Sequence, residues 1–171
     1  MDSAGNLYIA NTGGSDILKI DPSDNLLKVI SGDQDFPIVG GKLDPRRADQ
    51  PFDVTVGDDG SVYVVDLHQR IIKYTPDGKY IAEWKIGNIG GGQASMHLAS
   101  YKNLVYLSDY TAGGIYMLNT SDGSINLLGG PGSDPGRFAN PSGLATDSSG
   151  KLYVADRDNN WVQVFANPAK P

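Results

Sequence analysis

The hydrophobic residues of this chain fall into short runs that are bounded by glycine, proline, aspartate, asparagine or serine. The clearest set of four runs has turns at 58–60 and 76–78 between its members: Phe52–Val56, Val62–Val65, Ile71–Tyr74 and Tyr80–Trp84. Runs rich in β-branched and aromatic residues between such turns are typical of strands. No stretch longer than a turn keeps a 3.6-residue apolar period, and 22 glycines and 10 prolines would interrupt helices. The pattern therefore predicts an all-β protein.

The same succession of strands and turns returns four times along the chain. The tyrosines at the centres of the four copies are spaced by 55, 43 and 47 residues: Tyr8, Tyr63, Tyr106 and Tyr153. A β-sheet unit repeated in this way predicts a β-propeller, and a two-sheet sandwich would not explain the repetition. We expect one propeller domain over 1–171 with about four four-stranded antiparallel blades, in the approximate units 1–49, 50–94, 95–139 and 140–171. The first unit lacks its opening strand and the last lacks its outer strand, so we expect both blades to be incomplete.

The most specific motif of the chain lies at 141–156. It has a Pro-x-Gly start at Pro141, an Asp-x-x-Gly turn at Asp147, and a Leu-Tyr-Val-Ala strand that ends in Asp156. This motif resembles the repeat of NHL-repeat proteins, and the resemblance extends over essentially the whole chain. The third unit departs from it, because 96–103 lacks the Pro-Gly start and the Asp-Gly turn, and 105–109 leans toward the related YWTD type of propeller.

The resemblance implies a propeller, and family propellers of this kind usually carry six blades. Three arrangements are therefore open: an arc of a larger propeller, a closed four-blade ring, and a homodimer in which two chains complete a larger ring. The sequence opens within a repeat, so we expect a leader or further blades upstream. Similarity to bacterial extracytoplasmic propellers and the absence of cysteine favour a periplasmic or secreted location as part of a longer protein.

The charge pattern argues against nucleic acid as a partner. The formal net charge is -6, and all acidic residues except Glu83 are aspartates, which suit turns and caps. A phosphate-binding face needs clustered lysine and arginine, whereas the one adjacent basic pair, Arg46-Arg47, is flanked by Asp44 and Asp49. No apolar run approaches the roughly 20 residues that a membrane span requires.

In a propeller, the loops between second and third strands gather with the blade connectors on one face, which is the default binding site. The residue that ends each second strand is polar: Asn11, Asp66, Asp109 and Asp156. These side chains would either form a metal or acid/base ring or accept backbone hydrogen bonds within their own loops. We expect the second role, because a residue repeated in every blade usually serves the blade.

Polar residues that are unique to one unit are better candidates for binding a ligand. Three of them lie at or near the start of expected innermost strands: Asp53, His97 and Ser142. They offer a carboxylate, an imidazole and a hydroxyl, but their spacing does not show that they meet, and we predict no catalytic residue. In the loops, His68 and Arg70 would bind an anion or remain solvated, while Tyr110 and Arg157 would suit contact with protein or carbohydrate.

The connector at 32–50 is the longest irregular segment of the chain. Its apolar tip, 36–39, begins with Phe36, and its basic pair is Arg46 and Arg47. Loops of this length in compact domains tend to be functional or disordered. We expect a lid that contacts a partner, with a plug over the channel mouth as the structural alternative.

These features favour a non-catalytic binding or scaffold module that recognises a protein, peptide or saccharide through the loop face of the propeller. The alternative is a metal-dependent hydrolase or lyase, because similar propellers include calcium-dependent lactonases and zinc-dependent amidating lyases. Ligands for such sites are scarce here, since Glu83 lies in an expected outer strand and the histidines are His68 and His97. We therefore predict no metal site and no cofactor.

Overall fold

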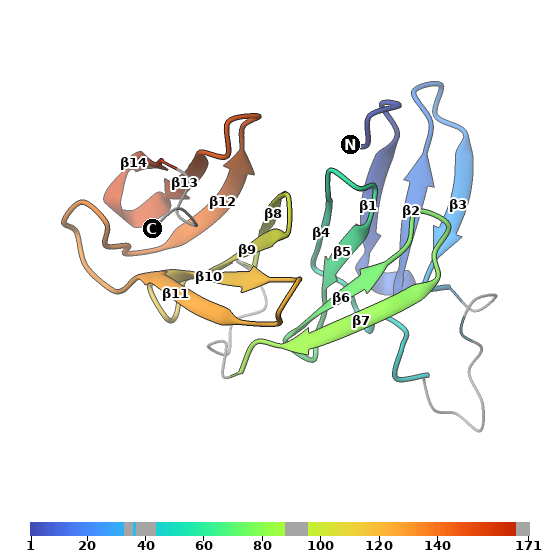
Figure 1. Cartoon of the computed structure of the whole chain (residues 1–171), viewed down its shortest axis with the longest axis horizontal. Helices are drawn as coiled ribbons and strands as arrows, with labels where there is room; N and C mark the ends of the chain where they lie inside the picture. Colours follow the sequence, from blue (N-terminus) through green and yellow to red (C-terminus); the bar gives the residue numbers. More distant parts are fainter. Residues whose placement is uncertain (33–35, 37–43, 88–95, 167–171) are drawn as a thin grey trace. The chain divides into compact units, whose positions relative to one another are not determined.

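The computed structural model describes residues 1–32, 36, 44–87 and 96–166, and strands dominate it (Figure 1). Among these residues the helical segments are the short 3-10 turns η1 (Thr12–Gly14) and η3 (Arg157–Asn159). No helix in this described part has the length and apolar character of a membrane span. The predicted all-β class is confirmed.

The chain divides into two compact units, Met1–Lys85 and Ile86–Pro171, and each unit contains two antiparallel sheets. The sheets of the first unit are β1-β2-β3 and β4-β5-β6-β7, with these strands: β1 (Leu7–Asn11), β2 (Asp16–Ile20), β3 (Leu26–Ile30), β4 (Asp53–Val56), β5 (Val62–Val65), β6 (Arg70–Tyr74) and β7 (Tyr80–Lys85). The sheets of the second unit are β8-β9-β10-β11 and β12-β13-β14, with these strands: β8 (Leu98–Tyr101), β9 (Leu104–Asp109), β10 (Gly114–Asn119), β11 (Ile125–Gly129), β12 (Pro141–Thr146), β13 (Leu152–Asp156) and β14 (Trp161–Phe165).

In all four sheets, strands that follow one another in the chain pair side by side (Figure 1). This is the meander of a propeller blade, as the repeat predicts. Within the described residues the first sheet has no counterpart of β4 and the last has no counterpart of β7, so the two expected incomplete blades are confirmed. That the four sheets form one propeller domain over 1–171 stays a prediction.

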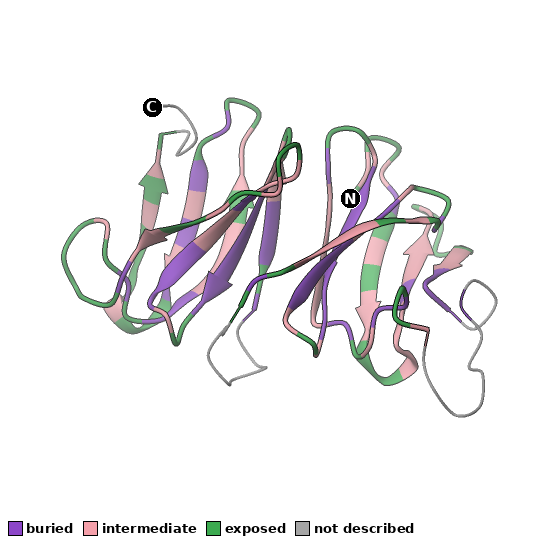
Figure 2. Ribbon diagram, turned by 60° about the horizontal axis from the view of Figure 1, so that its bottom comes forward, coloured by how far each residue is buried: buried purple, intermediate pink, exposed green. Residues whose placement is uncertain are grey.

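Side chains alternate between the two faces of each strand, and this alternation divides every sheet into two packing faces. In β5, Val62 and Val64 point to the core of the first unit together with Ile17, Ile30 and Tyr74. The equivalent residues of β13 point to the core of the second unit, which contains Leu152, Val154, Ile115, Tyr106 and Phe138. Figure 2 shows these buried strands in purple within each unit.

The turn between the first and second strands of the last sheet is fixed by an aspartate side chain. Asp147 accepts hydrogen bonds from the backbone N–H groups of Ser149 and Lys151, at 2.9 and 3.0 Å, and from the hydroxyl of Tyr153 at 3.1 Å. Gly150 completes this turn at φ +84, a conformation that L side chains rarely adopt. The Asp-x-x-Gly motif is therefore a local device that connects two strands.

Candidate functional site

The polar residues at the ends of the second strands form hydrogen bonds with the segments around them. Asp156 is fully buried, and its Oδ1 accepts hydrogen bonds from the backbone N–H groups of Ala139 and Asn140, at 3.1 and 2.9 Å. Its Oδ2 accepts from Asn159 Nδ2 at 2.7 Å and from Trp161 Nε1 at 3.1 Å. Burial raises the pKa of Asp156, but these hydrogen bonds outweigh it and hold the pKa below its ordinary value.

The equivalent residues of the other sheets are also hydrogen-bonded, though to different partners. Asp66 Oδ1 accepts from the backbone N–H of His68 at 3.0 Å. Asp109 Oδ1 accepts hydrogen bonds from the backbone N–H groups of Thr111 and Ala112, at 2.8 and 3.1 Å. Asn11 instead donates to Asp16 Oδ1 at 2.8 Å. Asp66 and Asp109 thus accept backbone hydrogen bonds from their own loops, as expected, whereas Asp156 accepts them from the preceding connector and Asn11 donates. The described residues include no group of three or more His, Cys, Asp or Glu that could hold a metal ion.

Arg70 is the centre of a buried polar network in the first unit. Its Nε donates to Asp66 Oδ2 at 2.9 Å, and its Nη1 lies 2.5 Å from Glu83 Oε2. Its guanidinium also donates to the backbone carbonyls of Pro45 and, at 2.6 Å, Arg47. Burial lowers the pKa of Arg70, but the carboxylates of Asp66 and Glu83 outweigh this and raise it above its ordinary value.

Three residues that the sequence placed on the binding face are buried in the first unit. Arg70 is 6% exposed and fully engaged in the network above, and Arg47 is 4% exposed and donates to the carbonyls of Gly14 and Ser15. Phe36 is buried in the core of the first unit, 6.2 Å from the ring of Tyr74. Their burial differs from the exposure that the sequence led us to expect, and their role in binding a partner stays a prediction. The rest of the predicted apolar tip, 37–39, lies outside the described residues.

The remaining predicted residues of the first unit are partly or largely exposed. His68 Nε2 lies 3.0 Å from Asp49 Oδ2, and 58% of the His68 side chain is exposed. Arg46 forms a two-pronged ion pair with Asp44 and lies over the ring of Phe36. Asp53 accepts a hydrogen bond from the backbone N–H of Val54 at 2.9 Å.

In the second unit, His97 is exposed just before β8, and its backbone N–H donates to Ser108 Oγ at 3.0 Å. Ser142 lies on β12, and its hydroxyl donates to the carbonyl of Ala155 at 3.1 Å. Asp53 belongs to the first unit, whereas His97 and Ser142 belong to the second, so the predicted trio stays a prediction. Tyr110 is 38% exposed at the end of β9.

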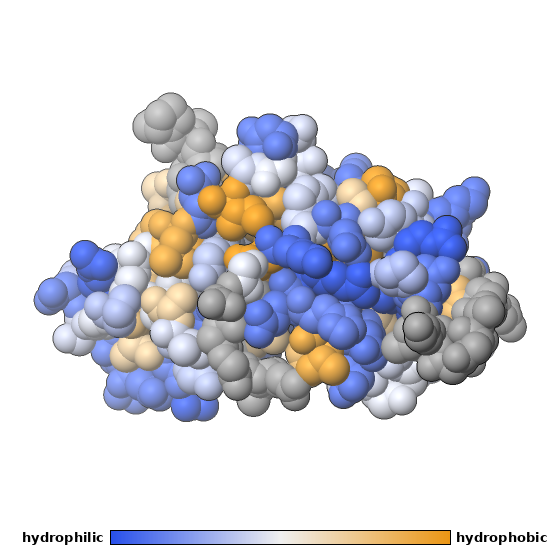
Figure 3. Space-filling view, turned by 90° about the horizontal axis from the view of Figure 1, so that it is seen from below, coloured by the Kyte–Doolittle hydropathy of each residue, from blue (hydrophilic) through white to orange (hydrophobic). Residues whose placement is uncertain are grey.

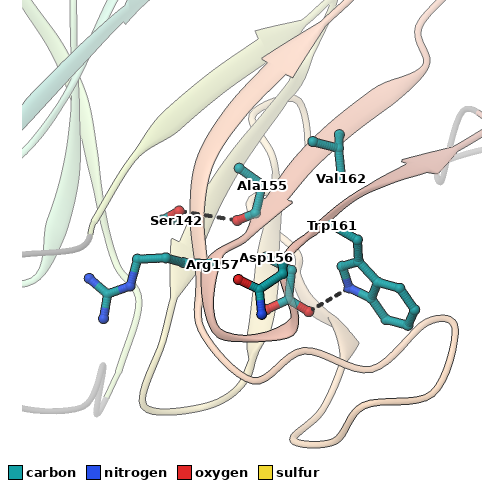
Figure 4. Close-up of a pocket in the computed structure, with 7 residues that line it drawn as sticks. Ser142, Ala155, Asp156, Arg157, Trp161 and Val162 are labelled. Carbon is teal, nitrogen blue, oxygen red and sulfur yellow. Dashed lines mark hydrogen bonds between the residues drawn. The ribbon is translucent and has the colours of Figure 1, made fainter.

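A surface hollow of about 410 Å³ in the second unit contains two of the predicted residues, Ser142 and Arg157 (Figure 4). Its lining comes from β12, β13, η3 and β14: Ser142, Ala155, Asp156, Arg157, Asn160, Trp161 and Val162. Trp161 is fixed by its hydrogen bond to Asp156, while the Arg157 side chain is 68% exposed and ion-paired with Asp158 at 3.1 Å. The hollow therefore presents an aromatic ring and a guanidinium beside apolar side chains.

The hollow continues onto the outer face of the last sheet, which we define as Tyr153, Ala155, Val162 and Val164. Val162 pairs with Ala155 and Val164 pairs with Tyr153, so all four side chains lie on the face opposite Leu152 and Val154. Val162 is 63% exposed and Val164 is 54% exposed. The exposure of both valines was not predicted from the sequence, because an apolar run is typical of a strand that is covered on both faces. Elsewhere, the apolar surface seen in Figure 3 occurs as patches among hydrophilic residues.

Comparisons with known proteins give one family match to this part of the chain and several relatives. The NHL repeat family matches residues 138–165, which contain the last sheet from Pro141 onward. Human NHL repeat-containing protein 3 is 26% identical over 130 residues, covering 74% of this chain and 25% of that protein. Mouse tripartite motif-containing protein 2 is 41% identical over 46 residues, covering 27% of this chain and 6% of that protein.

Rat peptidylglycine alpha-amidating monooxygenase is 24% identical over 178 aligned residues, covering 99% of this chain and 13% of that enzyme. The chain thus spans a quarter or less of the length of these relatives. The predicted resemblance is confirmed: residues 138–165 match the NHL repeat family, and the four sheets of the chain have the antiparallel meander of propeller blades.

Proposed function

We propose that this chain is a non-catalytic protein-binding module that holds its partner on the outer face of the last sheet. The observation that carries the proposal is the exposure of Val162 and Val164, at 63% and 54%, beside the hollow at Trp161. Large apolar side chains that share one face of a sheet favour association with another apolar surface.

The chemistry of the hollow favours protein over saccharide as the partner. Tryptophan and arginine are among the residue types that most often dominate protein interfaces, and here Trp161 and Arg157 line the hollow together with Ala155 and Val162. Saccharide sites need polar groups that are available for hydrogen bonds. Here the Trp161 Nε1 and the Ser142 hydroxyl already donate within the protein, to Asp156 and to Ala155.

The proposal is tested by selecting ligands for the full chain from a random peptide library and, separately, from a glycan array. We expect selected peptides to bind and Val162→Asp to weaken their binding at least about 30-fold, since central apolar contacts dominate such interfaces. Leu127→Asp is the matched control, because Leu127 is 47% exposed on β11, outside the proposed face. Binding of glycans alone, or peptide binding that survives Val162→Asp, would overturn the proposal.

A Trp84→Phe variant leaves Trp161 as the single tryptophan, so a ligand at the hollow changes the fluorescence of a known side chain. Thermal unfolding of the wild-type chain tests the alternative function. If zinc or calcium ions raised the melting temperature of the chain and peptides did not, the metal-dependent hydrolase or lyase would be favoured instead.

A further inference from the structure

The second strands of the sheets carry apolar residues on either side of the central tyrosine. In β1 these residues are Leu7 and Ile9, and they are 43% and 42% exposed. The equivalent residues of β5 and β13 are 0% exposed and belong to the cores of their units: Val62, Val64, Leu152 and Val154. The first sheet therefore exposes positions that an adjacent sheet covers elsewhere in the same chain.

The third strands show the same contrast at the other end of the chain. In β2, β10 and β14, one apolar residue pairs with the second-to-last residue of the preceding strand: Ile17 with Ala10, Ile115 with Ser108, and Val162 with Ala155. Ile17 and Ile115 are 0% exposed, whereas Val162 is 63% exposed. The last sheet therefore exposes the face that carries Val162, whereas the first sheet exposes its other face, the one that carries Leu7 and Ile9.

These two kinds of face pack against each other within both units. The core of the first unit joins Ile17 of β2 to Val62 and Val64 of β5. The core of the second unit joins Ile115 of β10 to Leu152 and Val154 of β13. The same type of sheet-to-sheet interface thus occurs once in each unit. The chain also exposes one further face of each of the two kinds that form it: the outer face of the last sheet, and the face of the first sheet that carries Leu7 and Ile9.

We propose that these two exposed faces are an interface between copies of this chain, with the last sheet of one copy packed against the first sheet of a second copy. This inference rests on the proposed protein-binding function and names the partner. The contact is heterologous, because two different faces meet, and each copy supplies one of each. It needs no exchange of strands, since the sheets associate through their faces as they do within the units.

The interface is tested by light scattering of the purified chain over a range of concentrations. We expect the wild-type chain to associate to at least twice its 18.2 kDa, and Val162→Asp or Ile9→Asp to raise the dissociation constant at least about 30-fold. Leu127→Asp is again the control and should associate like the wild type. Circular dichroism confirms folding, and Val164→Lys replaces Val162→Asp if that variant does not fold. A wild-type chain that is monomeric throughout would overturn the inference.

Mixing the two variants tests which faces meet. Val162→Asp chains keep an intact first sheet and Ile9→Asp chains keep an intact last sheet, so an equal mixture contains one unaltered pair of faces. We expect the mixture to associate more strongly than either variant alone. If the mixture behaves like the separate variants, the interface is not head to tail and the inference is wrong.

The absence of cysteine in the chain makes disulfide trapping clean. Under mild oxidation, a mixture of Ile9→Cys and Val162→Cys chains should give a linked dimer of the two different variants in preference to dimers of one. A chain with both substitutions that instead closes on itself as a linked monomer would overturn the second copy as the partner.

The outcomes separate this inference from the proposed function. If Val162→Asp abolishes peptide binding while the wild-type chain is monomeric, the face binds protein but the partner is not a second copy. If the chain associates head to tail and no peptide is selected, the second copy is its partner and the broader binding role is wrong.

Discussion

Asp156 gives the sharpest test of how the loops of this repeat are built. Its carboxylate is fully buried and accepts four hydrogen bonds, two from the backbone before β12 and two from side chains that follow β13. One side chain thus joins the connector, the loop and the hollow at Trp161. We consider its replacement by alanine and by asparagine.

The magnitude follows from the donors that each change leaves without an acceptor. Asp156→Ala removes all four bonds, and the buried backbone N–H of Asn140 would lose its acceptor. A buried donor without a partner costs about 1–3 kcal/mol, and water can reach the partly exposed Trp161, so we expect a total loss of about 3–5 kcal/mol. Asp156→Asn keeps one oxygen for the backbone, but its amide N–H groups face the donors of Asn159 and Trp161, so we expect about 1–3 kcal/mol.

The assay is urea unfolding followed by circular dichroism, repeated from about pH 7 to about pH 3. Because the folded pKa of Asp156 lies below its unfolded value, the carboxylate contributes stability above about pH 4, and this contribution is lost as the pH falls through the folded pKa. The difference between wild type and Asp156→Asn should therefore shrink in acid. A loss below about 1 kcal/mol for Asp156→Ala, or a difference from Asp156→Asn that does not depend on pH, would refute this reasoning.

Three further substitutions test other contacts, each by the free energy of unfolding in urea. Arg70→Met should cost about 3–5 kcal/mol because it leaves Asp66 buried without its counterion, and a loss below about 1 kcal/mol would contradict the network. Asp147→Asn should be less stable than wild type at neutral pH. Hydrogen bonds, first of all from Ser149, lower the pKa of Asp147 to about 2, so this difference in stability should vanish between about pH 4 and pH 2. A difference that stays constant over this range would contradict the reasoning. Gly150→Ala should cost about 1–3 kcal/mol, since φ is +84 and its Cβ would lie 2.5 Å from Tyr101 Cε1; unchanged stability would show that the turn relaxes freely.

The sequence predicted the local structure well because strands and turns depend on neighbouring residues. The run Val62–Val65 is an uninterrupted buried strand, and the Asp-x-x-Gly motif at Asp147 is a turn held by the side chain of its own first residue. The acceptor role of Asp156 was predictable only in part, because its backbone donors are Ala139 and Asn140 in the preceding connector and not residues of its own loop. The predicted missing strands of the first and last sheets follow from the same repeat.

The candidate site was less predictable, because burial depends on residues that are distant in the sequence. Arg70 follows a loop and looked solvated, yet its partners come from Pro45, Arg47 and Glu83 in other segments. Phe36 looked like an exposed tip and is buried against Tyr74. In each case the burial of the side chain depends on residues that are distant in the sequence but close in space.

The repeat pattern by itself thus determined the all-β class, the blade-like sheets and the residues that close each turn, since these depend on alternation and short-range hydrogen bonds. Only the tertiary structure decided which copies of one repeated position are covered. Ile17 and Val162 occupy equivalent positions, but Ile17 packs against the next sheet and Val162 faces solvent. Sequence periodicity assigns a side chain to a face of its strand, whereas exposure depends on whether another sheet lies against that face.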